Sequence, residues 1–381
     1  MGANRGPRAG GMIYLDYQAT TPVAPEVAAA MRPWIEEKYA NPHSPSKWGR
    51  EAAAAIEVAR GQVERTLGHV GGRFAFTSGA TEALNWALKG TFEDSQRRKL
   101  VTVATEHAAV LDTAEWLEAK GIEVVRLQVG TDGLIDLDMA EAVIDQQVAL
   151  VAVMLVNNEI GTIQPIAQLT QMAHRVGALM LCDAVQGFGR LPIPEGPDLI
   201  AISGHKIHGP KGVGGLWMRI GTEPEPLLHG GGQEQGLRSG TLAPALCVGM
   251  GEAARLAAER READAIHVEK LSEIALTTLG QGWIVNGGIE HRYRGNLNVR
   301  REVLDAARLI SDMRNVAFSL GSACASGSGR PSHVLRAIGL SDRQARSSIR
   351  LGFGRYTGEE ELASACRRIN EAAHEQTTLT A

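Results

Sequence analysis

The 381-residue sequence predicts an α/β fold, in which a large domain with a mostly parallel sheet flanked by helices is joined by a smaller α+β domain. Two observations support this class. Short apolar runs typical of strands alternate with helical patterns between Arg73 and Met218. Polar residues also follow directly after several of these runs, as expected where parallel strands end at a ligand crevice.

The first elements along the chain have clear local signals. Ala, Glu and Arg residues at helical spacing predict two helices before the alternation begins, and Gly, Pro and Ser clusters separate the segments. The predicted elements are a short strand and turn over Met12–Pro22, helices over Pro25–Tyr39 and Glu51–Leu67, a strand over Arg73–Phe76 and a helix over Glu82–Lys89.

The alternating part continues with apolar strands and amphipathic helices. The predicted strands are Leu100–Thr105, Val148–Val156, Ala178–Cys182, Leu199–Ile202 and Gly212–Met218, and the predicted helices follow His107 as far as Lys120 and cover Ile166–Val176. The segment Arg219–Gly240 is rich in Gly and Pro. Since structureless loops of this length are uncommon, it is expected to be functional or to lie at an interface.

The last third predicts a smaller unit. Its elements are a helix over Ala245–His267, strands over Gly295–Val299 and Asn315–Leu320, a helix over Glu302–Asp312, a strand entered at Ser347, and a closing helix over Gly358–Glu375. A chain of this length accommodates two domains. We expect residues 24–254 to form the large domain, and residues 1–23 and 255–381 to form the small one.

Composition excludes several classes of protein. A formal net charge of −4 gives no general electrostatic case for nucleic acid or an anionic membrane as partner. The longest apolar run, Val148–Val156, is too short to span a bilayer, and the N-terminus lacks the apolar core of a signal peptide. Four cysteines without a C-x-x-C pair suggest neither a disulfide framework nor a metal site. We expect a cytoplasmic protein.

Lys206 stands out within the segment Leu199–Trp217. It lies on a short Gly-bracketed loop at the mouth of a buried strand. Most lysines are solvated surface charges, which is the plain alternative. A lysine held at a sheet edge and shielded from water is, however, suited to Schiff-base chemistry with a carbonyl cofactor.

The turn Thr77–Thr81 has the pattern of an anion site. Small residues, including Ala80, stand between a strand and a helix start, where free backbone N–H groups and the Thr81 hydroxyl can bind a phosphate. A simple Ser or Thr helix cap is the alternative. The turn has no Walker lysine and is not G-x-G-x-x-G.

Six polar side chains follow predicted strands. They are Thr81, His107, Asn158, Asp183, Gln186 and Lys206. Each has a plain structural alternative, such as a cap or a core partner. Because the ends of parallel strands meet at one edge of a sheet, their joint occurrence indicates a single site.

Cys324 and Arg350 are further candidates in the last third. Cys324 is surrounded almost wholly by Gly, Ala and Ser, so it has no packing partners nearby in sequence; its reactivity depends on exposure and thiolate character. Arg350 enters a predicted strand and could bind a carboxylate through two hydrogen bonds, or be an ordinary surface arginine.

The motifs together resemble those of the cysteine desulfurases, which are pyridoxal-phosphate (PLP) enzymes of the aminotransferase class V group with the fold-type I architecture. They occur in the family's order from about Ile13 to the last helix. The matching segments are Tyr14–Pro22, Thr77–Glu82, Glu106–His107, Val156–Gly161, Asp183–Gln186, Ser203–Gly212, Arg238–Thr241 and Gly321–Cys324.

The resemblance implies roles in holding PLP. Lys206 would bind the cofactor covalently, Asp183 would pair with the ring nitrogen, and His107 would stack on the ring and move protons. The cofactor-binding set that the resemblance implies is Ala80, Thr81, His107, Asn158, Asp183, Gln186, Ser203, His205, Lys206 and, from the second subunit of a homodimer, Thr241.

The resemblance also implies the reaction. Arg350 and Asn158 would bind L-cysteine, and Cys324 would take its sulfur as a persulfide, leave alanine, and pass the sulfur to a protein acceptor. Departures at Ser46, Ala83, Leu84 and Leu320 leave the subgroup open, and with it the destination: iron–sulfur clusters, tRNA thiolation or cofactor synthesis. Alternatives are a selenocysteine lyase, another class V enzyme, or a catalytically silent binding subunit.

Overall fold

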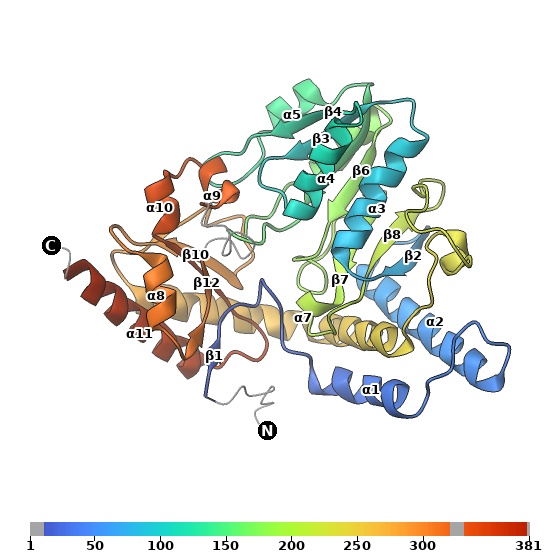
Figure 1. Ribbon diagram of the computed structural model, residues 1–381. Helices are drawn as coiled ribbons and strands as arrows, with labels where there is room; N and C mark the ends of the chain where they lie inside the picture. The colour runs from blue at the N-terminus through green and yellow to red at the C-terminus, as the bar shows by residue number, and fades with distance from the viewer. Residues whose placement is uncertain (1–10, 321–330, 379–381) are drawn as a thin grey trace.

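The computed structural model describes residues 11–320 and 331–378. Two groups of elements lie at the two ends of a long helix, α7 (Pro244–Leu279), as Figure 1 shows. The larger group surrounds a seven-stranded sheet, and the smaller group surrounds a four-stranded sheet.

The large sheet has the strand order β2-β8-β7-β6-β5-β3-β4. Its strands are β2 (Gly72–Thr77), β3 (Lys99–Val103), β4 (Glu123–Leu127), β5 (Val148–Met154), β6 (Leu179–Asp183), β7 (Leu199–Ser203) and β8 (Gly214–Arg219). Only β8 runs antiparallel to its neighbours, and the other six strands share one direction. The mostly parallel sheet predicted from the sequence is therefore confirmed.

Helices cover both faces of this sheet. One face packs against α3 (Ala80–Glu93) and α4 (Ala108–Glu118); the other packs against α1 (Pro25–Glu36), α2 (Lys47–Leu67), α5 (Leu137–Val143), α6 (Ile166–Arg175) and the first half of α7. Successive strand residues point to opposite faces, so Phe74 and Phe76 join one core while Ala75 joins the other. Both faces are apolar because both are buried.

The small sheet is antiparallel, in the order β12-β13-β10-β9. Its strands are β9 (Ile284–Val285), β10 (Asn296–Arg300), β12 (Ser319–Leu320) and β13 (Ser348–Gly352), and β1 (Ile13–Tyr14) pairs nearby with β11 (Val316–Ala317). The helices of this group are α8 (Ala306–Asp312), α9 (His333–Ala337), α10 (Asp342–Arg346) and α11 (Glu359–Thr378).

Helix α7 contributes to both cores. Met250 and Ala257 pack with the large sheet, whereas Leu271 and Leu279 pack with the small one. The helix was expected to end near His267, and that expectation was wrong. It continues until Gly280, whose positive φ of 68° is a backbone conformation that glycine adopts far more readily than other residues.

Other boundaries also differ from the predictions. Helix α2 begins at Lys47 rather than Glu51, because the hydroxyl of Ser46 accepts a hydrogen bond from the Gly49 amide at 3.1 Å and caps the helix. Elements β4, β9, α5, α9 and α10 were not predicted. Asp183 is the last residue of β6 rather than the first residue after it.

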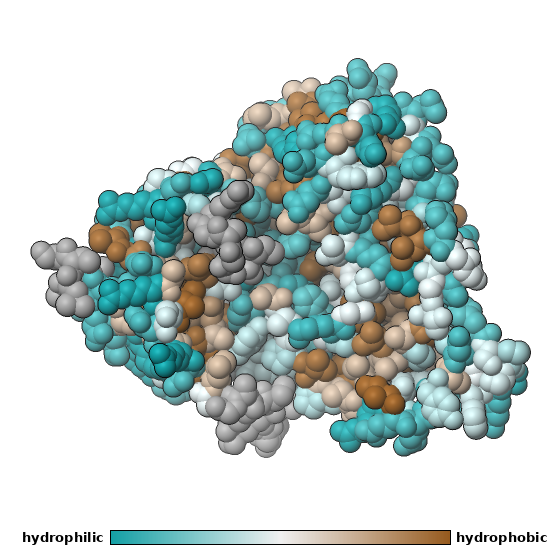
Figure 2. All heavy atoms as spheres, viewed as in Figure 1, coloured by the Kyte–Doolittle hydropathy of each residue, from teal (hydrophilic) through white to brown (hydrophobic). Residues whose placement is uncertain are grey.

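Hydrophilic side chains cover most of the outer helices on the face shown in Figure 2, with small apolar patches scattered between them. Within residues 11–320 and 331–378, every helix is too short or too polar to cross a lipid bilayer.

Candidate active site

A cavity of about 650 Å³ lies at the carboxyl ends of the parallel strands. It is lined by side chains and backbone from β2, β5, β6 and β7 ends and from the segment after β1. Nine of the ten residues expected to bind the cofactor line it together: Ala80, Thr81, His107, Asn158, Asp183, Gln186, Ser203, His205 and Lys206.

Lys206 ends a single 3-10 turn, Gly204–Lys206, between β7 and β8. Its amine donates hydrogen bonds to the backbone carbonyls of Gln18 at 2.5 Å and Ala19 at 2.7 Å. Burial lowers the pKa of Lys206 to about 7, and the positive charges of Arg190 and Arg350 contribute. A large share of the amine is therefore neutral, and thus nucleophilic, near neutral pH.

Asp183 is a buried carboxyl group on the same cavity. Burial raises its pKa, while Val185 N–H, His107 and Lys206 act in the opposite direction. Beside it, Glu106 is fully buried, and burial followed by the charge of Asp183 raises the Glu106 pKa well above its usual value. Glu106 therefore favours its protonated form, and Asp183 is the carboxyl group available for a cationic partner.

His107 caps the start of α4. Its Nδ1 accepts a hydrogen bond from the Ala109 amide at 3.1 Å, which places the ring proton on Nε2. Burial lowers the His107 pKa, and Lys206 adds to this effect while Asp183 opposes it. The ring is a neutral imidazole at the cavity wall, able to give and take a proton.

The turn before α3 has the features of an anion site. Helix α3 begins at Ala80, so its first N–H groups face the cavity that Thr81 also lines. Ser203 and His205 lie on the same cavity. Burial lowers the pKa of His205 to about 4, so that its ring is a neutral hydrogen-bonding group.

Gln186 and Asn158 are held by contacts with distant parts of the chain. The Gln186 amide nitrogen donates to the Gln18 carbonyl at 3.0 Å, and its oxygen accepts from Arg190 at 2.8 Å. The Asn158 carbonyl accepts from Arg350 at 3.0 Å. The side-chain amide of Gln186 is thereby positioned by two contacts, and the backbone of Asn158 is held by Arg350.

Arg350 is fully buried on β13 and does not line the cavity directly. Its guanidinium forms an ion pair with Asp16 at 2.8 Å and bonds the Asn158 carbonyl. The Nε atom is buried without a hydrogen-bond partner among the described residues. Arg350 is thus a preformed cation adjoining Asn158, with hydrogen-bonding capacity left.

Thr241, like Arg350, does not line the cavity. Thr241 is exposed, and it lies in the segment before α7. Cys324 lies outside the described residues. The other three cysteines, Cys182, Cys247 and Cys366, are buried free thiols.

Sequence reasoning missed the part played by Gln18, Ala19 and Thr20. They line the cavity, and Thr20 Oγ1 lies 3.1 Å from His205 Nδ1. The segment was interpreted as entry structure because nothing local places it against Lys206. Its membership of the motif Tyr14–Pro22 was the only signal of a role.

The donor set fits PLP. A lysine amine whose pKa is lowered can bind an aldehyde, a buried carboxyl group can pair with a pyridine nitrogen, and the α3 turn with its hydroxyl and imidazole neighbours can bind a phosphate. All three lie on one cavity large enough for the cofactor together with a small amino acid.

Comparisons with known proteins agree with this geometry. The family model described as aminotransferase class-V matches residues 13–364. Proteins named cysteine desulfurase IscS from Rickettsia bellii and Rickettsia akari are 42% and 43% identical, over 94% of this chain and 91% and 90% of those proteins.

Solved structures give the same picture. One, titled "NIFS-LIKE PROTEIN", superposes with a TM-score of 0.87 at 35% identity, covering 94% of this chain and 98% of that one. Another, titled "SspA in complex with cysteine", has a TM-score of 0.81 at 36% identity, covering 91% and 100%. With a cavity that fits PLP, a family match along nearly the whole chain and relatives above 40% identity, the chain belongs to the aminotransferase class V family and, within it, to the cysteine desulfurases.

Proposed function

We propose that this chain is a PLP-dependent cysteine desulfurase, which removes sulfur from L-cysteine, releases L-alanine and passes the sulfur to an acceptor. The observation that carries the proposal is that the Lys206 amine and the Asp183 carboxyl group lie on one cavity. The turn at the start of α3, which can bind a phosphate, lines the same cavity. The relatives named cysteine desulfurase support the choice of substrate.

PLP supplies an electron sink for amino-acid chemistry when it is bound. Lys206 would hold the cofactor and, once released, be a base near the substrate, because its lowered pKa lets it take a proton at neutral pH. Asp183 would pair with the ring nitrogen. His107, with its proton on Nε2, would stack on the ring and transfer protons.

Other cavity residues would orient the bound groups. Ala80, Thr81, Ser203 and His205 adjoin the start of α3 and would hold the phosphate; Asn158 and Gln186 would contact the ring oxygen. Arg350 would bind the carboxylate of L-cysteine by way of its unused hydrogen-bonding capacity, with Asn158 beside it.

The sulfur step would belong to Cys324. The carbon–sulfur bond of the substrate breaks, a sulfur–sulfur bond forms on the Cys324 thiolate, and the carbon product takes up a proton to become alanine. The three other cysteines are buried, and burial raises their pKa values, so they are unsuited to the step.

We further propose a homodimer with shared sites. The segment around Thr241 is fastened to its own subunit by an Arg60–Glu234 ion pair at 2.8 Å and an Arg238–Glu82 ion pair at 2.7 Å, yet Thr241 itself is exposed. An exposed Thr on an anchored segment is suited to reach the phosphate of a partner subunit.

The proposal extends to organisation and location. Residues 24–254 would form the large domain and residues 1–23 and 255–381 the small domain, with α7 shared between them. The buried free thiols fit the reducing cytoplasm. Sulfur acceptors would be proteins such as an iron–sulfur scaffold or a sulfur carrier.

The direct experiment is an absorbance spectrum of the purified protein followed by an assay with L-cysteine and a thiol reductant. A yellow protein that releases sulfide and alanine in equal amounts supports the proposal. Release of selenide from selenocysteine without sulfide from cysteine would instead indicate a lyase, and a colourless protein without activity would indicate a silent subunit.

A further inference from the structure

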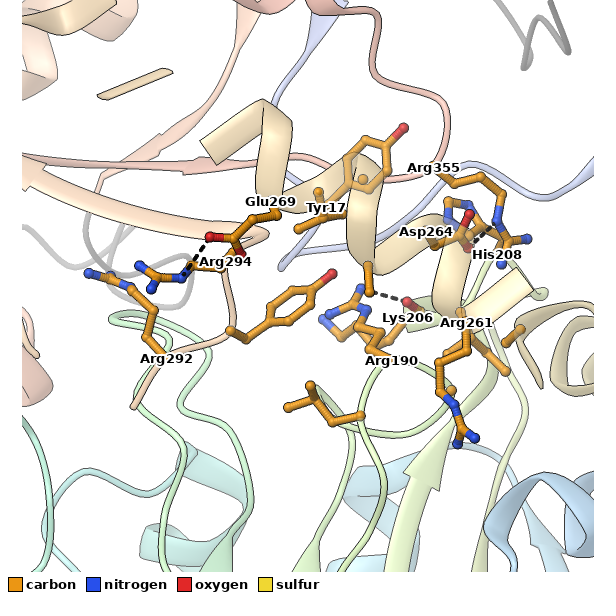
Figure 3. Close-up of a pocket in the computed structure, with 18 residues that line it drawn as sticks. Tyr17, Arg190, Lys206, His208, Arg261, Asp264, Glu269, Arg292, Arg294 and Arg355 are labelled. Carbon is orange, nitrogen blue, oxygen red and sulfur yellow. Dashed lines mark hydrogen bonds and ion pairs between the residues drawn. The ribbon is translucent and has the colours of Figure 1, made fainter. Parts of the chain in front are cut away.

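A second cavity, of about 260 Å³, lies behind the Lys206 loop, between the two groups of elements. Figure 3 shows its lining side chains, among them Tyr17, Arg190 and the α7 residues Asp264 and Glu269. Its walls come from the segment after β1, the 189–191 and 206–208 loops, α7, and the loops at 292–294 and 354–355. Lys206 belongs to the walls of both cavities, and its amine bonds the backbone carbonyls of Gln18 and Ala19, which line the catalytic cavity.

The cavity wall carries an excess of positive charge. Five arginines line it against two acidic residues. The acidic residues are already paired, Asp264 with Arg355 at 2.7 Å and Glu269 with Arg294 at 3.5 Å. The remaining lining arginines are Arg190, Arg261 and Arg292, and none has a carboxylate partner among residues 11–320 and 331–378.

Arg292 is the costliest of these charges to bury. It is only 7% exposed, it bonds the Ile160 carbonyl at 2.6 Å and the Gly288 carbonyl at 3.3 Å, and its Nε has no hydrogen-bond partner among the described residues. A buried guanidinium with only neutral partners is destabilising unless an anion comes near it. The cavity beside it is the place where one can bind.

Besides Lys206 and His208, the rest of the wall is largely apolar. Ala257, Ile207 and Val268 are buried side chains of the wall, and the ring of Tyr293 lies under the Arg190 guanidinium at 5.2 Å. Apolar walls with a few convergent charged groups are typical of small-molecule sites. The volume and the lining of the cavity therefore suit a small ligand with an apolar body and one acidic group.

We propose that this cavity, here called the arginine pocket and lined by Arg190, Arg261 and Arg292, binds a small organic anion with an apolar body and a carboxylate. The pocket is separate from the site of the proposed desulfurase reaction. Arg190 forms the wall between them, since it donates to the Lys206 carbonyl at 2.6 Å and to the Gln186 side chain at 2.8 Å. An anion beside Arg190 is thus one side chain away from two residues of the catalytic cavity.

Calorimetric titration of the PLP-bound enzyme with 2-naphthoate tests the pocket, and 2-naphthamide is the neutral probe of the same shape. We expect 2-naphthoate to bind at least roughly tenfold more tightly, because only the acid forms charge-assisted hydrogen bonds with arginine. Arg261→Gln, which changes an exposed lining residue, should weaken the binding of 2-naphthoate several-fold.

A matched pair of α7 variants locates the binding. Ala265 and Ala263 are both exposed on α7, but only Ala265 lines the pocket. Ala265→Trp should fill the pocket and abolish the binding of 2-naphthoate, Ala263→Trp should leave it unchanged, and both should keep the basal release of sulfide. Equal binding of acid and amide, absence of binding to wild type, or binding that survives Ala265→Trp would each overturn the proposal. None of these results depends on the desulfurase reaction, so the two proposals fail separately.

Discussion

The amine of Lys206 lies 2.5 Å from the backbone carbonyl of Gln18, although the two residues are 188 positions apart. The same carbonyl accepts from the Gln186 side chain at 3.0 Å. One peptide group of the N-terminal segment therefore orients two residues of the catalytic cavity, and it fixes the lysine before any ligand binds.

The first prediction concerns what holds that segment in place. A Cβ on Gly352 would lie 1.8 Å from Gln18 Oε1 and 2.7 Å from the Tyr17 amide nitrogen. Gly352→Ala should therefore shift the segment, lower the free energy of unfolding by about 1 to 3 kcal/mol and weaken the binding of PLP. Thermal unfolding and cofactor titration measure both effects.

Gly61→Ala is the matched control. The added Cβ would meet only the flexible end of Arg65 at 3.2 Å, and within helix α2 the change should raise the free energy of unfolding by up to about 1 kcal/mol. If Gly352→Ala were as stable as wild type and bound PLP normally, the segment would not be the support that the contacts indicate.

The second prediction follows from the Lys206 pKa of about 7. Only the neutral amine attacks an aldehyde, so PLP capture by the cofactor-free protein should slow as the pH falls below 7. Arg190→Gln removes a positive charge that lowers this pKa, and the profile should move to higher pH. Stopped-flow absorbance at a series of pH values checks it. An unmoved profile would mean that Arg190 has no electrostatic effect on the lysine.

The same shift affects stability. The unfolded lysine, with a pKa near 10.4, binds a proton that the folded lysine has lost, so between about pH 7 and pH 10 this group makes stability rise with pH. Lys206→Met should flatten that part of the curve in the cofactor-free protein, as measured by denaturant unfolding at several pH values.

The residues at the ends of the parallel strands could be predicted from the sequence to form one site. His107, Asn158 and Asp183 could be grouped from the sequence because β3, β5 and β6 are parallel, and parallel strands end at one edge. The apolar runs were long and clearly bounded, so their existence was evident. The last residue of each strand was harder to predict: Asp183 was expected to follow β6, but it is the last residue of that strand.

Contacts between distant segments could not be predicted in this way. Gln18 meets Lys206, and Asp16 meets Arg350, through the packing of β1 beside β11 and the bridge to Gly352, none of which has a local signature. Strand β4 was missed because its residues Glu123 and Arg126 interrupt the apolar pattern of an edge strand. Helix α7 is longer than predicted, because no Gly or Pro follows His267 until Gly280.

The third prediction concerns Asp183. Its carboxyl group should be the partner of the cofactor ring nitrogen, and asparagine cannot keep that nitrogen protonated. Asp183→Asn should bind PLP but release alanine at least about 100-fold more slowly. Absorbance reports the bound cofactor and an alanine assay reports the rate. Turnover near that of wild type would rule out the pairing.

The fourth prediction tests the shared site by mixing two inactive or weakened variants. In a dimer of Lys206→Ala with Thr241→Ala, one site lacks both groups, but the other has Lys206 from one subunit and Thr241 from its partner. Purified mixed dimers should therefore regain about half of the wild-type activity per site, and an equal mixture with random pairing, in which half of the dimers are mixed, should regain about a quarter.

Each variant alone is the control, with sedimentation confirming the dimer. Mixtures no more active than the sum of their parts would place Thr241 on the site of its own subunit. An active monomer in sedimentation would exclude sharing altogether.

The last prediction separates the two halves of the reaction at Cys324. The residues that bind PLP and L-cysteine do not include it, so Cys324→Ser should keep the yellow colour and respond to L-cysteine with a change of spectrum, while release of alanine stops. A serine hydroxyl stays protonated near neutral pH, whereas a thiol with a reference pKa of about 8.5 is partly thiolate. Burial raises the pKa values of Cys247 and Cys366 to about 12 and that of Cys182 well above its usual value, so none can substitute. Mass spectrometry after one turnover should find the added sulfur on Cys324 alone. Alanine released by Cys324→Ser at the wild-type rate would mean that sulfur leaves without a protein acceptor, as in a lyase.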